Sequence, residues 1–232
     1  MLVYGRNVAR ELLNKNEKVS KIILQEGFDD KNIISLIESK NIKVEYKQKR
    51  EIDNLAKGVH QGILLSIPDY KYKSIEEILN DNTSFVVILD HLEDPHNFGA
   101  IIRTCEAAGV DAIIIPKDRQ VQVNSTVMKT SAGTLDDMNI VLVANLVNAI
   151  ERLKDNGFWI VGTALDSNLD YRDIDYSGKK ALVIGNEGKG MSQIVTKACD
   201  YIAKIPMYGK TNSLNASVAS GIMIYEMIRN RK

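Results

Sequence analysis

The chain has 232 residues, of which 44% are hydrophobic and 26% are charged, a composition that is ordinary for a soluble globular protein. No stretch approaches the roughly 18 consecutive apolar residues of a membrane span, and the N-terminus does not have the apolar segment of a signal peptide. Cys105 and Cys199 stand alone, which argues against a disulfide framework or a structural zinc site, and we expect a cytoplasmic protein. The 30 basic residues equal the 30 acidic ones, and this balance by itself weakens a nucleic-acid-binding interpretation.

Residues 1–67 alternate helical and strand patterns and predict a compact α/β unit. Apolar spacing predicts helices over 5–13, 33–37 and 50–56, and strands over 19–24, 42–46 and the end of 58–67. This unit holds 12 basic and 9 acidic residues, a net charge of +3, with four bases and one acid in the run KVEYKQKR at 43–50. The run is either a solvated face or a surface that contacts RNA phosphates.

A polar linker, placed at residues 68–80, separates this unit from a second one. Within the linker, Ser74 is a predicted helix N-cap, with Glu76 and Glu77 in the next turn. Residues 81–232 then alternate strands and helices, which indicates a parallel sheet. We expect strands over 85–89, 112–115, 158–163, 180–184 and 201–205, and helices over 98–109, 124–130, 146–153 and 213–228. The last helix is predicted to bury a stripe of Leu214, Val218, Ile222 and Tyr225.

Three loops at the carboxyl ends of strands, where parallel sheets bind ligands, are rich in polar residues and glycine. The first places Asn97 at a candidate helix N-cap and Arg103 two turns further on, where an ordinary surface arginine is the alternative. The second, GNEGKG at 185–190, permits close backbone approach to a ligand but matches neither a dinucleotide nor a Walker pattern. The third contains Ser213, a candidate N-cap, and leaves Asn215 as a buried or ligand-facing amide.

Together the three loops resemble those of the SpoU (SPOUT superfamily) RNA methyltransferases. The matching stretches are DPHNFGAIIRTCEAAGVDAIIIPKDR with the following KTSAG, then VIGNEGKGM, then KIPMYGKTNSLNASVASGI, in the same order and spacing. The leading segment, through YGRNVARELL and GVHQGI, is similar to that of the bacterial 23S rRNA guanosine 2′-O-methyltransferases. The resemblance implies transfer of a methyl group from S-adenosylmethionine (AdoMet) to a ribose 2′-hydroxyl of RNA, most closely a guanosine of 23S rRNA.

The resemblance also implies an architecture, a cofactor and partners. It implies a parallel-sheet α/β domain with a deep trefoil knot that binds AdoMet, releases S-adenosylhomocysteine and uses no metal. It implies a homodimer, and a ribosomal-protein-L30e-like RNA-binding domain in residues 1–67, where we expect Lys47, Lys49 and Arg50 to contact phosphates. The cofactor residues would be Gly185, Ile205 and Leu214, with Thr163 and Gly188 nearby. The catalytic residues would be Asn97, Arg103, Glu187, Ser213 and Asn215.

The expected mechanism centres on Arg103. The family assigns the equivalent arginine to the substrate phosphate and to acceptance of the hydroxyl proton, although a free guanidinium stays charged to a pKa above about 12. We therefore expect Arg103 to fix the phosphate and stabilise the developing alkoxide, with the proton going to Arg103 or to water. Asn97, Glu187, Ser213 and Asn215 would position Arg103 and the ribose.

Other functions are compatible with the same residues. A tRNA substrate keeps the chemistry, but tRNA-specific relatives often have shorter helical extensions in place of residues 1–67. A non-catalytic RNA-binding factor in ribosome assembly would not need the catalytic residues to be intact. A methyltransferase that acts on protein or on a small molecule would leave the L30e-like segment without a purpose.

Overall fold

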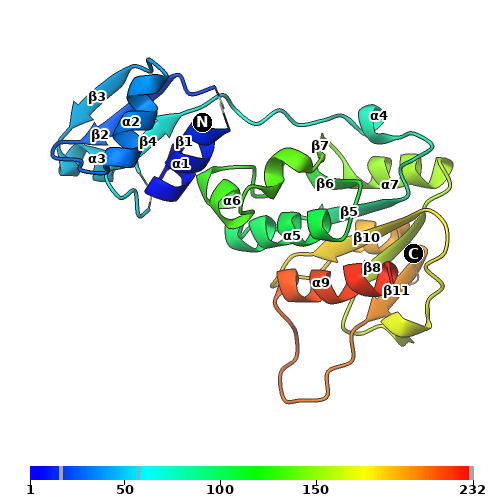
Figure 1. Ribbon diagram of the computed structural model, residues 1–232. Coiled ribbons are helices and arrows are strands. Elements are labelled where there is room, and N and C mark those ends of the chain that lie inside the picture. Colours follow the sequence, from blue (N-terminus) through cyan, green and yellow to red (C-terminus); the bar gives the residue numbers. More distant parts are fainter. Residues whose placement is uncertain (16–17, 57, 230–232) are drawn as a thin grey trace. The chain divides into compact units, whose positions relative to one another are not determined.

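The computed structural model describes residues 1–15, 18–56 and 58–229, and Figure 1 shows its course. The chain separates into two compact units: residues 1–71 with 123–129, and residues 72–122 with 130–232. Each unit has its own sheet. Within the described residues, no helix has the length and apolar character needed to cross a membrane.

The first unit is a mixed four-stranded sheet with helices on both faces. The side chains of β2 alternate between the two faces: Ile22 and Leu24 pack with α1 and α2, whereas Ile23 packs with α3. Strand order is β1-β4-β2-β3, and only the β2–β3 pair is parallel. The elements are β1 (Leu2–Tyr4), α1 (Arg6–Asn14), β2 (Lys21–Gln25), α2 (Lys31–Ser39), β3 (Val44–Lys47), α3 (Lys49–Leu55) and β4 (Ile63–Ser66).

The second unit is built on a seven-stranded sheet in which every pair of neighbours is parallel, as the alternation of strands and helices predicted. All six residues of β5 are buried, because helices cover the sheet on both faces. Strand order is β7-β6-β5-β10-β8-β11-β9. The strands are β5 (Phe85–Asp90), β6 (Ala112–Pro116), β7 (Ile140–Val143), β8 (Trp159–Thr163), β9 (Leu169–Asp170), β10 (Lys180–Gly185) and β11 (Tyr201–Lys204).

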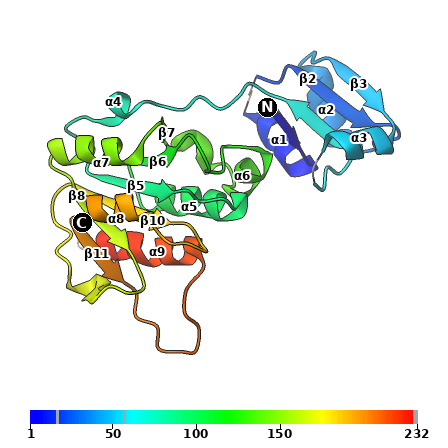
Figure 2. The same ribbon diagram turned by 180° about the vertical axis from the view of Figure 1, so that it is seen from behind.

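Two helical layers enclose this sheet, as Figures 1 and 2 show from opposite sides. Apolar residues of α4 (Ile75–Ile78), α7 (Leu146–Asp155) and α8 (Gln193–Ala198) pack in one core with the sheet. On the other face, α5 (Pro95–Ala107) packs against α9 (Ala216–Met227), which also contacts β10. The second unit also contains the 3-10 helices η1 (Thr134–Asp137) and η2 (Tyr171–Asp173), whereas most of α6 (Ser125–Thr130) belongs to the first unit.

The helix caps confirm one sequence prediction and correct two. Ser74 caps α4 in a reciprocal capping box with Glu77, as predicted. The N-cap of α5 is Asp94, not Asn97, because Pro95 takes the first helical position, where its missing N–H is not needed. The N-cap of α9 is Asn215, not Ser213: its side-chain oxygen accepts the backbone N–H groups of the next turn.

The predicted buried stripe of α9 is also wrong for the single chain. Val218 and Tyr225 are 50% and 54% exposed. The side chains that face the sheet and α5 lie on another face of the helix and are Ala216, Ser220, Met223, Ile224 and Met227. Ser220 can be buried because its hydroxyl donates a 2.7 Å hydrogen bond to the carbonyl of Ala216 one turn earlier. The helix therefore has a buried face and a second, exposed apolar face.

Both cysteines are expected to be unreactive in the folded protein. Burial raises the pKa of the Cys105 thiol far above its ordinary value and that of the Cys199 thiol to about 12. At pH 8, alkylation of either thiol should be slower by about 10³-fold than in the unfolded chain, because the thiolate is the nucleophile. Mass spectrometry after timed iodoacetamide treatment, with and without urea, measures this difference. Rapid labelling of native Cys105 would contradict the buried position of α5.

Candidate active site

Polar side chains gather at the carboxyl edge of the second sheet. Because the strands are parallel, the ends of β5, β8, β10 and β11 meet at one edge. The loop after β10 folds into a tight turn, in which Asn186 and Gly190 exchange backbone hydrogen bonds of 3.0 and 2.9 Å. The Asn186 side-chain oxygen accepts the N–H groups of Gly188 and Lys189. Glu187 is exposed at the tip of this turn.

A chain of three side chains connects this turn to both α5 and α9. The Asn215 Nδ2 donates to the Asn97 Oδ1 at 2.9 Å, and the Asn97 Nδ2 donates to the Glu187 Oε1 at 2.9 Å. The direction of the chain is fixed by the helix cap, since Asn215 must present its oxygen to the N–H groups of α9 and so presents its amine to Asn97. Asn97 is thus hydrogen-bonded to two residues that lie 90 and 118 positions further along the chain.

A buried carboxylate ties the loops after β5 and β10 together. Asp90, at the end of β5, is 1% exposed. Its two oxygens lie 2.6 Å from the Nδ1 of His91 and 2.6 Å from the backbone N–H of Ser192, which donates to it. Asn186 adds a second link by donating to the His91 carbonyl at 2.8 Å. Asp90 and Asn186 were missed as site residues by sequence reasoning. An acidic residue at the end of an otherwise apolar buried strand was the available signal.

Arg103 and Ser213 do not join this hydrogen-bonded group in the single chain. Arg103 is exposed on α5, and its guanidinium forms no hydrogen bond or ion pair with any residue that the structure describes. Ser213 is exposed just before α9, where its carbonyl accepts from the Thr211 hydroxyl at 3.2 Å. The structure therefore brings together Asn97, Glu187 and Asn215 of the five predicted catalytic residues and leaves the other two accessible.

Three of the predicted cofactor residues lie at or just after neighbouring strand ends, whereas Gly188 lies in the turn after β10 and Leu214 lies just before α9. Thr163 ends β8 and donates to the Val183 carbonyl at 3.3 Å, Gly185 ends β10, and Ile205 follows β11. Ile205 and Leu214 are only partly buried, so they offer apolar surface beside backbone groups. At Gly185, a Cβ atom would lie 2.3 Å from the backbone of residues 190 and 191, so only glycine permits the turn to fold back here. These features fit an adenosyl group, with its apolar base and polar ribose.

The three predicted RNA-contacting cations of the first unit differ in their surroundings. The amine of Lys47 pairs with Glu45 at 2.9 Å and Glu51 at 3.5 Å. Hydrogen bonds from Lys21 and Lys47 lower the pKa of Glu45 to about 2, so the Lys47 charge is already balanced by a firmly ionised partner. Lys49 and Arg50 are exposed and form no ion pair within the described part of the chain. Of the three predicted cations, Lys49 and Arg50 therefore carry charges that no described carboxylate balances.

Two family models match the chain, one in each unit. The model described as the SpoU rRNA methylase family matches residues 84–225. The model described as RNA 2′-O ribose methyltransferase substrate binding matches residues 2–73. A TrmH family tRNA/rRNA methyltransferase of Staphylococcus aureus strain MSSA476 is 42% identical over 238 residues, which covers 99% of this chain and 96% of the relative.

Solved structures share the fold. The AdoMet-bound rRNA methyltransferase from Sinorhizobium meliloti is 24% identical, with a TM-score of 0.76 that covers 100% of this chain and 87% of that one. A TrmH/SpoU tRNA-modifying enzyme from A. aeolicus is 34% identical with a TM-score of 0.60, and the match covers 68% of this chain and 80% of that one. The structure that matches the whole chain is named for rRNA, whereas the one that matches 68% of it is named for tRNA.

Proposed function

This chain belongs to the SpoU rRNA methylase family, and we propose that it transfers the methyl group of AdoMet to a ribose 2′-hydroxyl of 23S rRNA, at a guanosine. The observation that carries the proposal is the Glu187–Asn97–Asn215 hydrogen-bonded chain beside Gly185, at the edge where parallel sheets bind ligands. Three side chains from distant segments are held in one orientation there, which suits a reaction that depends on alignment.

AdoMet would be held at the strand ends by Thr163, Gly185, Gly188, Ile205 and Leu214. When bound, it supplies an electrophilic methyl group on a sulfonium that leaves as the neutral thioether of S-adenosylhomocysteine. The residues of the chain then have three tasks: to place the ribose hydroxyl in line, to exclude water, and to stabilise the charge that develops on the hydroxyl oxygen. The C2′ oxygen gains the methyl group as its proton leaves.

Arg103 is the residue to which we assign the substrate phosphate and the developing alkoxide. Its guanidinium is exposed and unpaired within the described residues, so an incoming phosphate meets no competing carboxylate. A bidentate guanidinium–phosphate pair also fixes the orientation of the adjacent ribose. The hydroxyl proton passes to water, because a guanidinium that binds the phosphate is already protonated. Ser213 and the Glu187–Asn97–Asn215 chain position the reacting groups.

Support for rRNA over tRNA comes from the first unit. The substrate-binding model matches residues 2–73, and the rRNA methyltransferase of S. meliloti aligns along the whole chain. The tRNA-modifying enzyme of A. aeolicus aligns with only 68% of it. We therefore assign the L30e-like domain (residues 1–67) to rRNA binding, the segment 68–80 to the linker, and residues 81–232 to the catalytic domain. An enzyme with this substrate would work in the cytoplasm.

Two further features of the family are proposed for this chain. A homodimer would cover the exposed apolar face of α9, where Val218 and Tyr225 are half exposed, and sedimentation equilibrium would then give the mass of two chains. A trefoil knot would follow from the return of the chain after β11 to pack α9 against α5 and β10. A partner chain on this face would enclose Arg103 on α5 and Ser213 just before α9, which are exposed in the single chain.

The test is methyl transfer from labelled AdoMet to unmodified 23S rRNA and to bulk tRNA. Label in rRNA that maps to one guanosine ribose supports the proposal. Label in tRNA alone would keep the chemistry and overturn the substrate assignment. If AdoMet binds but neither RNA is labelled, an assembled ribosomal particle is tried as substrate, and failure there would indicate a non-catalytic RNA-binding factor.

Glu187→Gln is expected to lower kcat by about 10-fold to 100-fold, because a hydrogen bond to a charged acceptor contributes about 1.5–3 kcal/mol. The new amide can still accept from Asn97, so the geometry persists while the charge is lost. The dissociation constant of AdoMet should stay within twofold, as measured by calorimetry. Glu151→Gln, an exposed residue on α7 in the opposite helical layer, is the charge-matched control. An unchanged kcat would remove Glu187 from the catalytic residues.

A further inference from the structure

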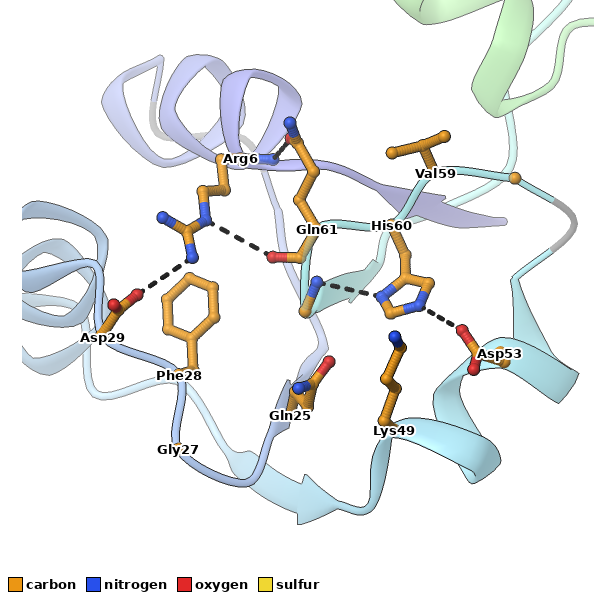
Figure 3. Close-up of a pocket in the computed structure, with 12 residues that line it drawn as sticks. Arg6, Gln25, Gly27, Phe28, Asp29, Lys49, Asp53, Val59, His60 and Gln61 are labelled. Atoms are coloured by element: carbon orange, nitrogen blue, oxygen red, sulfur yellow. Dashed lines mark hydrogen bonds and ion pairs between the residues drawn. The ribbon is translucent and has the colours of Figure 1, made fainter.

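The first unit contains a cavity of about 720 Å³ that the methyl-transfer site does not use. It lies at the carboxyl ends of β2 and β3 and is lined by the start of α1, residues 25–29, the first turns of α3 and residues 58–62, as Figure 3 shows. Its size falls in the range of about 300–1,000 Å³ that is usual for small-ligand pockets. Four separate segments of the first unit line this cavity, and side-chain hydrogen bonds hold several of them in place.

His60 fixes one wall of this cavity. Its side chain is buried, and its Nδ1 accepts the backbone N–H of Gly62 at 3.0 Å. Since Nδ1 carries no proton in that arrangement, Nε2 carries it and donates to the Asp53 carboxylate on α3 at 2.7 Å. His60 is therefore a positioning residue that ties the loop at 58–62 to α3. The same hydrogen bond fixes the orientation of the Asp53 carboxylate.

Arg6 and Gln61 fix the opposite wall by two hydrogen bonds, both donated by Arg6 and accepted by Gln61. The Gln61 side-chain oxygen accepts the backbone N–H of Arg6 at 2.9 Å, and the Arg6 Nε donates to the Gln61 carbonyl at 3.4 Å. Gln61 is held at φ 51°, a left-handed conformation that costs a non-glycine residue free energy. Strained backbone of this kind is retained where the surrounding structure determines it, and it often lines ligand sites.

The cavity offers surfaces for a flat ring and for an anion. The Arg6 guanidinium lies 5.0 Å from the centroid of the Phe28 ring, and Arg6 also binds Asp29 at 3.0 Å. Val59 is 74% exposed at the rim. In Figure 3 the Gln25 amide stands between Phe28 and Lys49, and the Lys49 side chain points toward the His60 ring. The two carboxylates of the lining already have partners, since Asp29 binds Arg6 and Asp53 binds His60. The Lys49 charge has no partner among the described residues.

We propose that this cavity receives one unstacked nucleotide of the RNA substrate, with its base against Phe28, Arg6 and Val59 and its phosphate at Lys49. Proteins read single-stranded RNA by splaying out a base, stacking it on aromatic rings or guanidinium planes, and bonding its polar edge. Gln25 has both a donor and an acceptor for such an edge. The proposal rests on the proposed function for its RNA, and it locates the point at which the first unit recognises that RNA.

The test measures binding of unmodified 23S rRNA fragments to the full chain by fluorescence anisotropy at several salt concentrations. Lys49→Gln should weaken binding and lower the salt slope by about one unit, because one phosphate contact is lost. Val59→Asp, at an exposed position that can change without unfolding the domain, should weaken binding at least fivefold. Phe28→Leu keeps the apolar volume and removes the stacking face, so it should raise the Kd without changing the salt slope.

Lys43→Gln is the matched control, because this substitution removes the same charge as Lys49→Gln. Lys43 is exposed just before β3, at the end of the strand away from the cavity. The variant should bind RNA within twofold of the wild-type protein. Photo-crosslinking with thio-substituted RNA should attach nucleotides to peptides that contain residues 25–29 or 58–62. Wild-type affinity in Lys49→Gln, Val59→Asp and Phe28→Leu together would overturn the proposal, as would crosslinks confined to the catalytic domain.

Failure of this proposal differs from failure of the proposed function. Binding is measured without turnover, so the two readouts are independent. If the wild-type protein methylates rRNA and the three cavity variants bind it normally, only the cavity assignment is wrong. If no RNA is methylated but the three variants still lose affinity while Lys43→Gln does not, the cavity assignment stands and the catalytic proposal is wrong.

Discussion

Replacing Arg103 with alanine is expected to lower kcat for RNA methylation by about 10²–10³-fold, the usual effect of removing one donor that stabilises developing negative charge. Arg103 is exposed and pairs with no described residue, so its loss should leave the free energy of unfolding nearly unchanged. AdoMet affinity should also be unchanged. Single-turnover methylation, thermal unfolding and calorimetry measure the three quantities separately.

Two further variants sharpen this prediction. Arg103→Lys keeps the charge but removes the planar fork, so most of the rate should still be lost if the phosphate is held by two parallel hydrogen bonds. Lys197→Ala removes an exposed cation from α8, in the other helical layer, and should methylate at the normal rate. Normal turnover in Arg103→Lys would argue against the bidentate role, and normal turnover in Arg103→Ala would exclude Arg103 from the mechanism.

The sheet of the second unit was predictable because its strands are buried on both faces. A run such as residues 85–90 has apolar residues at nearly every position, which is typical of a covered parallel strand. Very short strands carry no such signal: β1 has three residues and β9 has two, and neither was predicted. Strand β7, at the edge of the sheet, was also missed, although its four residues are all apolar.

The active site could be predicted only in part, because local patterns do not specify long-range contacts. Asn97, Glu187 and Asn215 are isolated polar residues in three loops, and it was the family resemblance, not any spacing, that predicted a shared site. The sequence also offered Ser213 as the N-cap and left Asn215 as a buried or ligand-facing amide. The structure selects Asn215, and tertiary contact gives the physical reason: the same side chain must also donate to Asn97.

The exposed face of α9 shows a different limit. Leu214, Val218, Ile222 and Tyr225 do follow helical spacing, and an apolar stripe was a sound inference from them. The helix is apolar around much of its circumference, however, and its inward face includes Ser220, whose hydroxyl is satisfied within the helix. Periodicity identifies an apolar face but does not say whether it packs in the same chain or against a second one.

Gly185→Ala is expected to abolish measurable AdoMet binding and to lower the free energy of unfolding by about 1–3 kcal/mol, the usual cost of overpacking. The added Cβ would lie 2.3 Å from two backbone atoms, the Gly190 carbonyl carbon and the Met191 nitrogen, and no rotation of a side chain can relieve that contact. The turn at 186–190 would have to open, and Glu187 would move away from Asn97 with it. Urea unfolding and calorimetry measure the two effects.

The matched control for this substitution is Gly209→Ala. Gly209 lies in an exposed loop, where a Cβ would meet nothing within 4 Å and the backbone is not in the left-handed region. The same added methyl group should therefore leave AdoMet affinity and stability unchanged there. If Gly185→Ala binds AdoMet as tightly as the wild-type protein, the close return of the turn onto β10 is not required for the cofactor site. If Gly185→Ala unfolds at a lower urea concentration yet still binds AdoMet, Gly185 is needed only for folding. The cofactor must then be held by residues at the ends of β8 and β11.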